Sequence, residues 1–174
     1  MNGSALVIGF TLLLGALALL LIALRMRRST GLPAGRLIYT DTSNWQRNMQ
    51  SLYSHKHRLA GKPDYLIQDG KSVIPVELKS GEAPQEPREG HVMQLAAYCL
   101  LVEETYQTRP TYGIIQYADR QFAVDYTDAL RTSLLEQMTQ MRTEGYLPSG
   151  PHRSHTDPSR CAGCGVRHEC NQRL

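Results

Sequence analysis

The pattern of apolar and polar positions separates an uninterrupted apolar run near the N-terminus from a body in which the pattern alternates. Twenty residues from Ala5 to Leu24 carry no charged side chain. In the body, apolar stretches bounded by turn residues such as Asp69-Gly70 predict strands. The expected strands cover residues 64–68, 73–79, 112–117 and 121–126.

Helical spacing predicts the remaining elements of the body. Apolar residues recur every three or four positions over residues 91–104, and a second helix, capped by Thr127 or Asp128, is expected to run to Thr143. A short polar helix is expected over residues 44–54, because a run of N-cap residue types precedes it. Strands interspersed with helices predict an α/β domain with a mixed sheet.

The apolar run predicts a transmembrane helix, because twenty helical residues span about 30 Å, the thickness of a bilayer's hydrocarbon core. Arg25, Arg27 and Arg28 follow it, which predicts a single-pass protein with its domain in the cytoplasm. A cleaved signal peptide is the alternative, but Met1 to Ser4 carry no charged side chain. A helix buried in a globular core would normally show one polar face, and this one shows none.

Composition then divides the chain into four parts. Residues 1–28 are expected to form the anchor with its basic flank, and residues 29–36 a linker containing Gly, Pro and Ser. Residues 37–144 form the expected core domain, and residues 145–174 a cysteine-rich tail.

The net charge of +3 comes largely from the basic flank. The chain has 19 Lys and Arg against 16 Asp and Glu, so without the three flanking arginines the body is balanced at 16 against 16. A neutral body argues against a broad phosphate-binding surface, although a local basic groove remains compatible with it.

Candidate chemistry gathers on the first predicted hairpin. Glu77 and Lys79 lie two apart on one strand, so their side chains leave the same face. Asp64 lies opposite Glu77 if the loop covers residues 69–72, or diagonal to it if a two-residue turn covers 69–70. Two carboxylates on one face form an oxygen site suited to Mg²⁺ or Mn²⁺, which polarises a phosphodiester and activates water. Lys79 beside them stabilises charge on the phosphoryl group or positions the attacking water.

A polar stripe on the first long helix is expected to look toward this hairpin. Gln94 and Tyr98 are four residues apart and share a helix face, and His91 lies on the same side. The alternative is that these side chains form only a solvated helix edge and an exposed strand pair.

The segment Gly61-Lys-Pro-Asp64, followed by Glu77-Leu-Lys79 and by Gln94-x-x-x-Tyr98, resembles the PD-(D/E)XK nucleases with the extension of the RecB-like group. The resemblance implies a restriction-endonuclease-like core with a mixed sheet. It also implies that Asp64 and Glu77 are metal ligands, that Lys79 is the catalytic lysine, and that Gln94 and Tyr98 position DNA or the lysine. The expected function is a metal-dependent DNA exonuclease tethered to the membrane. A non-catalytic nucleic-acid-binding or assembly module is the alternative.

The cysteine tail, Cys161-x-x-Cys164 followed by Cys170, resembles CRISPR-associated exonucleases of the Cas4 type. The resemblance implies a four-iron cluster, held by these cysteines and one upstream cysteine, and in this chain Cys99 or a ligand other than cysteine is the candidate for the fourth position. A zinc site completed by a histidine is the second interpretation, and a tail that binds nothing is the third. The candidate histidines for the zinc site are His152, His155 and His168.

Two departures from the family pattern stand out. The upstream histidine ligand has no clear counterpart, because only His55 and His57 precede the motif, close to Gly61, and we interpret both as surface residues. The upstream cluster cysteine is also missing. Cys99 is the first cysteine, and its place on an apolar helix face predicts a buried core thiol.

Overall fold

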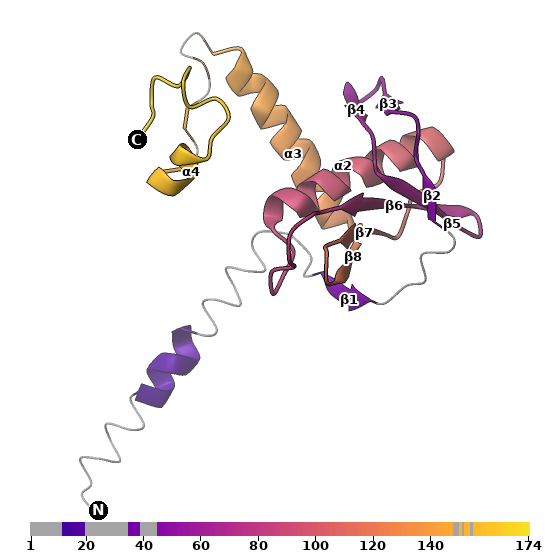
Figure 1. Ribbon diagram of the computed structural model, residues 1–174, viewed down its shortest axis with the longest axis horizontal. Coiled ribbons are helices and arrows are strands. Elements are labelled where there is room, and N and C mark those ends of the chain that lie inside the picture. Colours follow the sequence, from indigo (N-terminus) through magenta and orange to yellow (C-terminus); the bar gives the residue numbers. More distant parts are fainter. Residues whose placement is uncertain (1–11, 20–34, 39–44, 148–149, 151, 154) are drawn as a thin grey trace, which may run out of the picture. The chain divides into compact units, whose positions relative to one another are not determined.

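The computed structural model describes residues 12–19, 35–38, 45–147, 150, 152–153 and 155–174 (Figure 1). The chain divides into two compact units, Met1–Leu134 and Leu135–Leu174. The first unit holds both sheets of the described chain, and the second holds the cysteine tail.

The first unit is built on a six-stranded mixed sheet with the order β1-β8-β7-β6-β5-β2. Its neighbouring strands are antiparallel except β6 and β7, which are parallel. The helix α2 (Glu89–Tyr106) connects these two, as a parallel crossover requires. The strands are β1 (Arg36–Ile38), β2 (Trp45–Arg47), β5 (Tyr65–Asp69), β6 (Ser72–Leu78), β7 (Tyr112–Gln116) and β8 (Gln121–Asp125). The mixed α/β core agrees with the expected fold.

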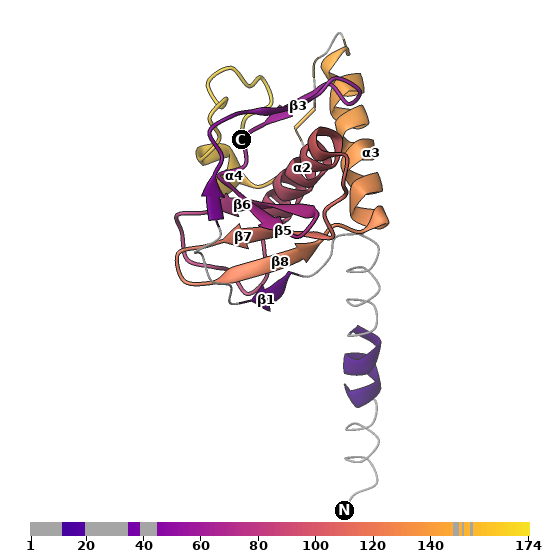
Figure 2. The same ribbon diagram turned by 90° about the vertical axis from the view of Figure 1, so that its right-hand side faces the viewer.

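Helix α2 covers one face of this sheet (Figure 2). Its side chains Leu95, Leu100 and Leu101 are at most 1% exposed, as are Ile114 and Ile115 of β7. Close approach is possible because β7 has a glycine at position 113, where an added Cβ would lie 2.8 Å from Leu95. The hairpin of β3 (Leu52–Ser54) and β4 (Leu59–Gly61) also packs on α2.

The turn between β5 and β6 determines the register on which the candidate site depends. Asp69 pairs with Ser72, so Gly70 and Lys71 form a two-residue turn. Gly70 adopts a φ of +58°, a left-handed conformation that glycine takes without steric cost. Continuing this register from the pair Tyr65–Val76 places Asp64 opposite Glu77. This register is the first of the two predicted, in which Asp64 lies opposite Glu77. The observed loop is shorter than the predicted loop over residues 69–72, because Asp69 and Ser72 also pair.

The ends of the four predicted strands and of the two predicted long helices lie within two residues of the observed ends. The second long helix is α3 (Asp128–Gly145). The Thr127 hydroxyl accepts a hydrogen bond from the Leu130 N–H, which caps α3. The predicted helix over residues 44–54 is wrong, because β2 and β3 occupy this segment. β2 pairs with β5 at the sheet edge, and the Trp45 ring lies 5.6 Å from that of Tyr65. Sheet pairing and burial outweigh the local capping signal here.

The predicted transmembrane helix is also wrong. Of the segment Ala5–Leu24, the structure describes a helix over residues 12–19, and the rest lies outside the described residues together with Arg25, Arg27 and Arg28. No helix among the described residues is both long enough and apolar enough to cross a membrane. This finding overturns the single-pass topology and the membrane localisation, and it leaves the membrane unsupported as a partner. The apolar run reports side-chain composition, which by itself does not establish a membrane-spanning helix.

Candidate active site

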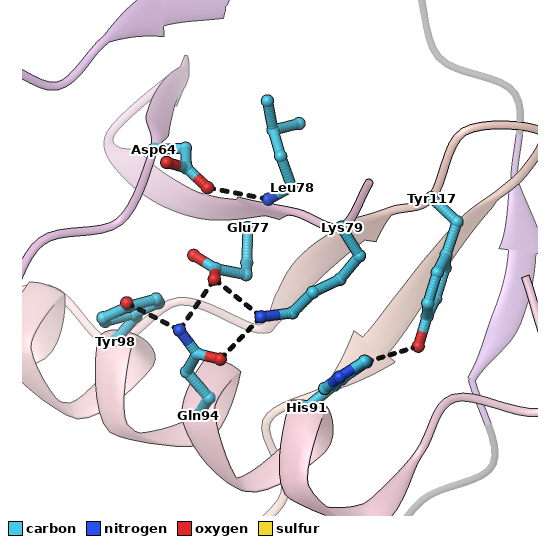
Figure 3. Close-up of polar contacts among 8 residues, drawn as sticks. All are labelled: Asp64, Glu77, Leu78, Lys79, His91, Gln94, Tyr98 and Tyr117. Atoms are coloured by element: carbon cyan, nitrogen blue, oxygen red, sulfur yellow. Dashed lines mark hydrogen bonds and ion pairs between the residues drawn. The ribbon is translucent and has the colours of Figure 1, made fainter. Parts of the chain in front are cut away.

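The five candidate residues of the core come together where the β5–β6 hairpin meets α2 (Figure 3). Asp64 directly precedes β5, Glu77 lies near the end of β6, and Lys79 directly follows it. Gln94 and Tyr98 project from α2 toward these residues. Residues from separate parts of the chain therefore form one polar cluster.

Asp64 is held by backbone groups on both sides. Its Oδ2 accepts a hydrogen bond of 2.8 Å from the N–H of Leu78. The N–H of Asn48 donates to the carbonyl of Asp64 at 3.0 Å, and the Asn48 side chain donates to the carbonyl of the buried Pro63 at 3.1 Å. Asn48 thereby supports the segment that carries the carboxylate. Sequence reasoning missed Asn48 because it falls within the segment predicted as a helix.

Glu77 is the most buried member of the cluster, with 7% of its surface exposed. Its Oε1 accepts hydrogen bonds from Lys79 Nζ at 2.9 Å and from Gln94 Nε2 at 2.7 Å. Burial raises the pKa of Glu77 above its usual value, the ammonium of Lys79 opposes this rise, and the neighbouring carboxylate of Asp64 adds to it. The two carboxylates therefore repel one another while Lys79 offsets part of the charge.

Gln94 connects the lysine to the tyrosine. Its Oε1 accepts from Lys79 Nζ at 2.8 Å, and its Nε2 donates both to Glu77 and to the Tyr98 hydroxyl, the latter at 2.9 Å. Both ends of the amide are used, so the flipped orientation would place donor against donor at Lys79. Gln94 therefore fixes where the ammonium and the carboxylate lie relative to each other.

Tyr98 occupies space left by a missing side chain. A Cβ added at Gly61 would lie 2.9 Å from the Tyr98 ring, so this position of β4 accommodates the ring only as glycine. Burial raises the pKa of the Tyr98 phenol, which keeps it as an O–H group at neutral pH. Its oxygen accepts a hydrogen bond from Gln94, and the nearby carboxylate of Glu77 also raises the pKa of the phenol. Sequence reasoning treated Gly61 only as a break in the chain.

His91 lies on the same helix face but belongs to a separate pair. Its Nδ1 is 2.7 Å from the Tyr117 hydroxyl, and the Tyr117 ring packs edge-on against Phe122. Burial lowers the pKa of His91, and the positive charges of Lys79 and Arg88 lower it further. The neutral imidazole is therefore favoured beside the site.

The donor set of the cluster fits a divalent cation with hard oxygen ligands. Asp64 and Glu77 bring two carboxylates together, and a divalent cation held by them would relieve their mutual repulsion. Within the part of the chain that the structure describes, no three His, Cys, Asp or Glu side chains are arranged to hold a metal ion. Water and backbone oxygens would have to complete the coordination, which is usual for Mg²⁺.

Comparison with known proteins agrees with this geometry. The family model of the PD-(D/E)XK nuclease superfamily matches residues 20–171, which is most of the chain. The chain belongs to the PD-(D/E)XK nuclease superfamily. The resemblance predicted from the motifs is confirmed, and the family is one of enzymes that act on nucleic acid.

A curated member of this group is similar over most of the chain. It is the CRISPR-associated exonuclease Cas4 of Francisella tularensis subsp. novicida (strain U112), with 30% identity over 124 residues. The aligned region covers 71% of this chain and 61% of that protein, so the chain spans less than two thirds of the relative's length.

Neither of the two histidines that precede the PD-(D/E)XK motif lies at the cluster in the position of the family's upstream histidine ligand. His55 is exposed, as predicted. His57 is half-buried, and its Nε2 lies 3.6 Å from a carboxylate oxygen of Glu104. Glu104 lies ten residues after Gln94 on α2, about 15 Å along the helix, so His57 contacts α2 away from the cluster.

The cysteines of this PD-(D/E)XK chain fall into two kinds. Cys99 is 1% exposed in the core of the first unit, and burial raises the pKa of its thiol, which agrees with the predicted core role. Cys161 is buried, and Cys164 and Cys170 are half-buried in the second unit. All four are free thiols.

Proposed function

We propose that this chain is a divalent-metal-dependent DNA nuclease that acts as an exonuclease. Asp64 and Glu77 hold Mg²⁺ or Mn²⁺, and Lys79 is the catalytic lysine. The observation that carries the proposal is the closed network in which Lys79 donates to Glu77 and Gln94 while Gln94 donates to Glu77. The alternative interpretation, an exposed strand pair and a solvated helix edge, does not account for this network.

When bound, the cation supplies Lewis-acid polarisation of the phosphodiester and lowers the pKa of a coordinated water. The carboxylates of Asp64 and Glu77 bind and orient the cation. Lys79 places an ammonium beside Glu77, where it donates to the attacking water or to a phosphoryl oxygen as negative charge develops. Its side chain is 20% exposed, so the group is accessible from solvent yet held in place.

Gln94 and Tyr98 act as positioning residues. Gln94 holds the ammonium of Lys79 and the carboxylate of Glu77 in one geometry, which reduces the reorganisation needed in the transition state. Tyr98 in turn holds the amide of Gln94 through its hydroxyl oxygen. The similarity to a CRISPR-associated exonuclease supports exonuclease rather than endonuclease action for this chain. DNA is the substrate implied by the motif resemblance.

End-labelled linear DNA and closed circular single-stranded DNA of the same sequence test this proposal. The full chain should degrade linear DNA with Mn²⁺ or Mg²⁺, should stop when the metal is chelated, and should leave circular DNA intact. Asp64→Asn should abolish degradation while the circular dichroism spectrum stays unchanged. Cleavage of the circle would remove the exonuclease assignment, and cleavage by the Asp64 variant would remove the site.

One observation favours a second function. The sequence offers no clear counterpart of the family's upstream histidine ligand, and His57 lies 3.6 Å from a carboxylate oxygen of Glu104, away from the cluster. A domain that lacks this ligand fits a nucleic-acid-binding or assembly module that does not hydrolyse. Salt-sensitive DNA binding without cleavage under any divalent metal would favour the module over the nuclease.

A further inference from the structure

The hairpin of β3 and β4 presents one face to α2 and the other to solvent. Leu52 and Ser54 are buried on the inner face, where Leu52 shares a core cluster with Leu101 of α2. Tyr53 lies between them in sequence, on the outer face, and is 63% exposed. It pairs with Ala60 of β4, which is also exposed. The strand period therefore separates a face that packs from a face that a partner can reach.

Ala60 leaves the ring of Tyr53 uncovered on the outer face. Side chains directly opposite on an antiparallel pair have Cβ atoms about 4.5–5.5 Å apart, so a large residue at position 60 would pack over the tyrosine. Alanine has only its methyl group there. A single exposed ring is ordinary on a protein surface, so the groups around Tyr53 decide whether it forms a site.

The same tyrosine lines a cavity of about 220 Å³. Pockets that enclose drug-sized ligands measure about 300–1,000 Å³, so this one fits a smaller group, such as one base of a longer strand. Its wall includes a phenol ring, an imidazole and a guanidinium, which are the groups on which unpaired bases stack. The cavity is lined by Tyr53, Ser54, His55, Arg58, Leu59 and Ala60.

The charge of the hairpin has the sign that a phosphate backbone requires. Residues 52–62 contain Lys56, Arg58 and Lys62 and neither Asp nor Glu. Glu104 of α2 lies 3.7 Å from Lys56 and offsets that charge in part, whereas Arg58 lines the cavity itself. Because the rest of the body is balanced in charge, this segment is a local basic surface rather than part of a general one.

Arg58 is held at the hairpin tip in a conformation that is unfavourable for arginine. Its N–H donates to the His55 carbonyl at 3.3 Å, which closes the loop between the paired residues Ser54 and Leu59. Its φ is +46°, in the left-handed region that glycine adopts without steric cost. Glycine would therefore make the more stable turn, and the guanidinium supplies a charge at the cavity that glycine lacks.

The hairpin leads directly into the candidate active site. Gly61 ends β4 beside the ring of Tyr98, which an added Cβ would approach to 2.9 Å. Ala60 precedes Asp64 by four residues, so at most about 14 Å separate their Cα atoms. At a rise of about 3.4 Å per nucleotide in a stacked strand, this distance corresponds to about four nucleotides.

We propose that this cavity binds one base of single-stranded DNA, stacked on Tyr53, with Arg58 holding an adjoining phosphate. The inference deepens the proposed nuclease function and rests on it for the choice of DNA. A base enters the cavity only when it is unpaired, so the site selects single strands over duplex. A protein partner fits less well, because lysine is depleted at protein interfaces, whereas Lys56 and Lys62 flank this cavity in sequence.

The test is the affinity of the full chain for two fluorescein-labelled strands in EDTA, where chelation prevents metal-dependent cleavage. One strand is oligothymidylate, and the other is an abasic strand of equal length, which keeps the phosphates without the bases. Tyr53→Leu should weaken thymidylate binding by about 5- to 150-fold, the range that one stacked base contributes, and leave abasic binding unchanged. Tyr53→Phe keeps the ring, so this matched control should bind both strands like the unaltered chain.

Arg58→Gly tests the phosphate contact. Glycine takes a φ of +46° without steric cost, so the turn is retained. Both strands should bind more weakly, and the slope of log affinity against log salt should fall by about 0.7, the value for one phosphate contact on a single strand. Lys71→Ala removes a lysine from the exposed turn between β5 and β6 and should leave the slope unchanged. A slope that Arg58→Gly does not change overturns the phosphate contact.

Equal thymidylate affinity for Tyr53→Leu and the unaltered chain, with circular dichroism showing the same fold, overturns the stacking role. An equal loss in Tyr53→Phe overturns it as well, because the ring is still present. Binding that depends on the Tyr53 ring, in a chain that never degrades linear DNA with Mn²⁺, supports the site and removes the nuclease proposal. Degradation of DNA by a chain whose thymidylate affinity does not depend on Tyr53 removes the site alone.

Discussion

Lys79 Nζ lies 2.8 Å from the side-chain oxygen of Gln94, although one residue follows a strand and the other lies on the helix that packs against the sheet. This contact orients the ammonium from outside its own strand. The same amide donates to Glu77, so one side chain sets the relation between the proposed catalytic lysine and a proposed metal ligand.

Replacement of Gln94 should therefore reduce the rate more than it reduces metal binding. Gln94→Ala removes the acceptor of Lys79 and a donor to Glu77, and loss of such a supporting partner typically lowers activity by about 10- to 100-fold. Cleavage rate and Mn²⁺ affinity of the variant would be measured in parallel. Gln140→Ala on α3 is the control, because among the described residues that exposed side chain hydrogen-bonds to Glu144, within its own helix. Equal rates for the two variants would show that the contact does not matter for catalysis.

Glu77 should make the stability of the metal-free protein depend on pH. Its pKa in the folded state is raised above the ordinary value of 4.5, mainly by burial. The folded state therefore binds the proton more tightly than the unfolded state, and stability falls as the pH rises from 4.5 through the raised pKa. Glu77→Gln lacks this titration and should show a flatter urea-midpoint curve over that range. Parallel curves for the two proteins would contradict the raised pKa.

Gly61 should be intolerant of even a methyl group. The added Cβ of Gly61→Ala would lie 2.9 Å from the Tyr98 ring and 3.0 Å from Leu101, so the ring must shift. Overpacking of this kind costs about 1–3 kcal/mol, and movement of Tyr98 should also weaken its bond to Gln94. Thermal unfolding and cleavage rate would both be measured. Gly81→Ala has open space around it and should match the unaltered protein; if Gly61→Ala matches it too, the packing role is refuted.

Much of the site could be predicted because it depends on two simple periodicities. The strand period puts Glu77 and Lys79 on one face, and the helix period puts Gln94 and Tyr98 on another. The choice between two hairpin registers required the observed turn at Gly70, since the sequence around it permits both.

Other features depend on contacts between distant segments, which local patterns do not report. Asn48 supports Asp64 only because β2 pairs with β5, whereas its local sequence resembles a helix start. The pairing of Tyr53 with Ala60 likewise appears only once the hairpin of β3 and β4 is folded. The apolar run before residue 25 shows the opposite error, in which a strong compositional signal predicted a membrane span that the described helix does not form.

The most direct test of the central claim is the single-turnover cleavage rate of end-labelled linear DNA with Mn²⁺, compared between Lys79→Ala and Lys71→Ala. Both changes remove one lysine, but Lys71 lies in the exposed hairpin turn, whereas Lys79 donates to Glu77 and Gln94. The account predicts that Lys71→Ala cleaves like the unaltered chain and that Lys79→Ala is slower by at least about 100-fold, the usual loss when a transition-state donor is removed. A Lys79→Ala variant that cleaves as fast as Lys71→Ala would contradict the account.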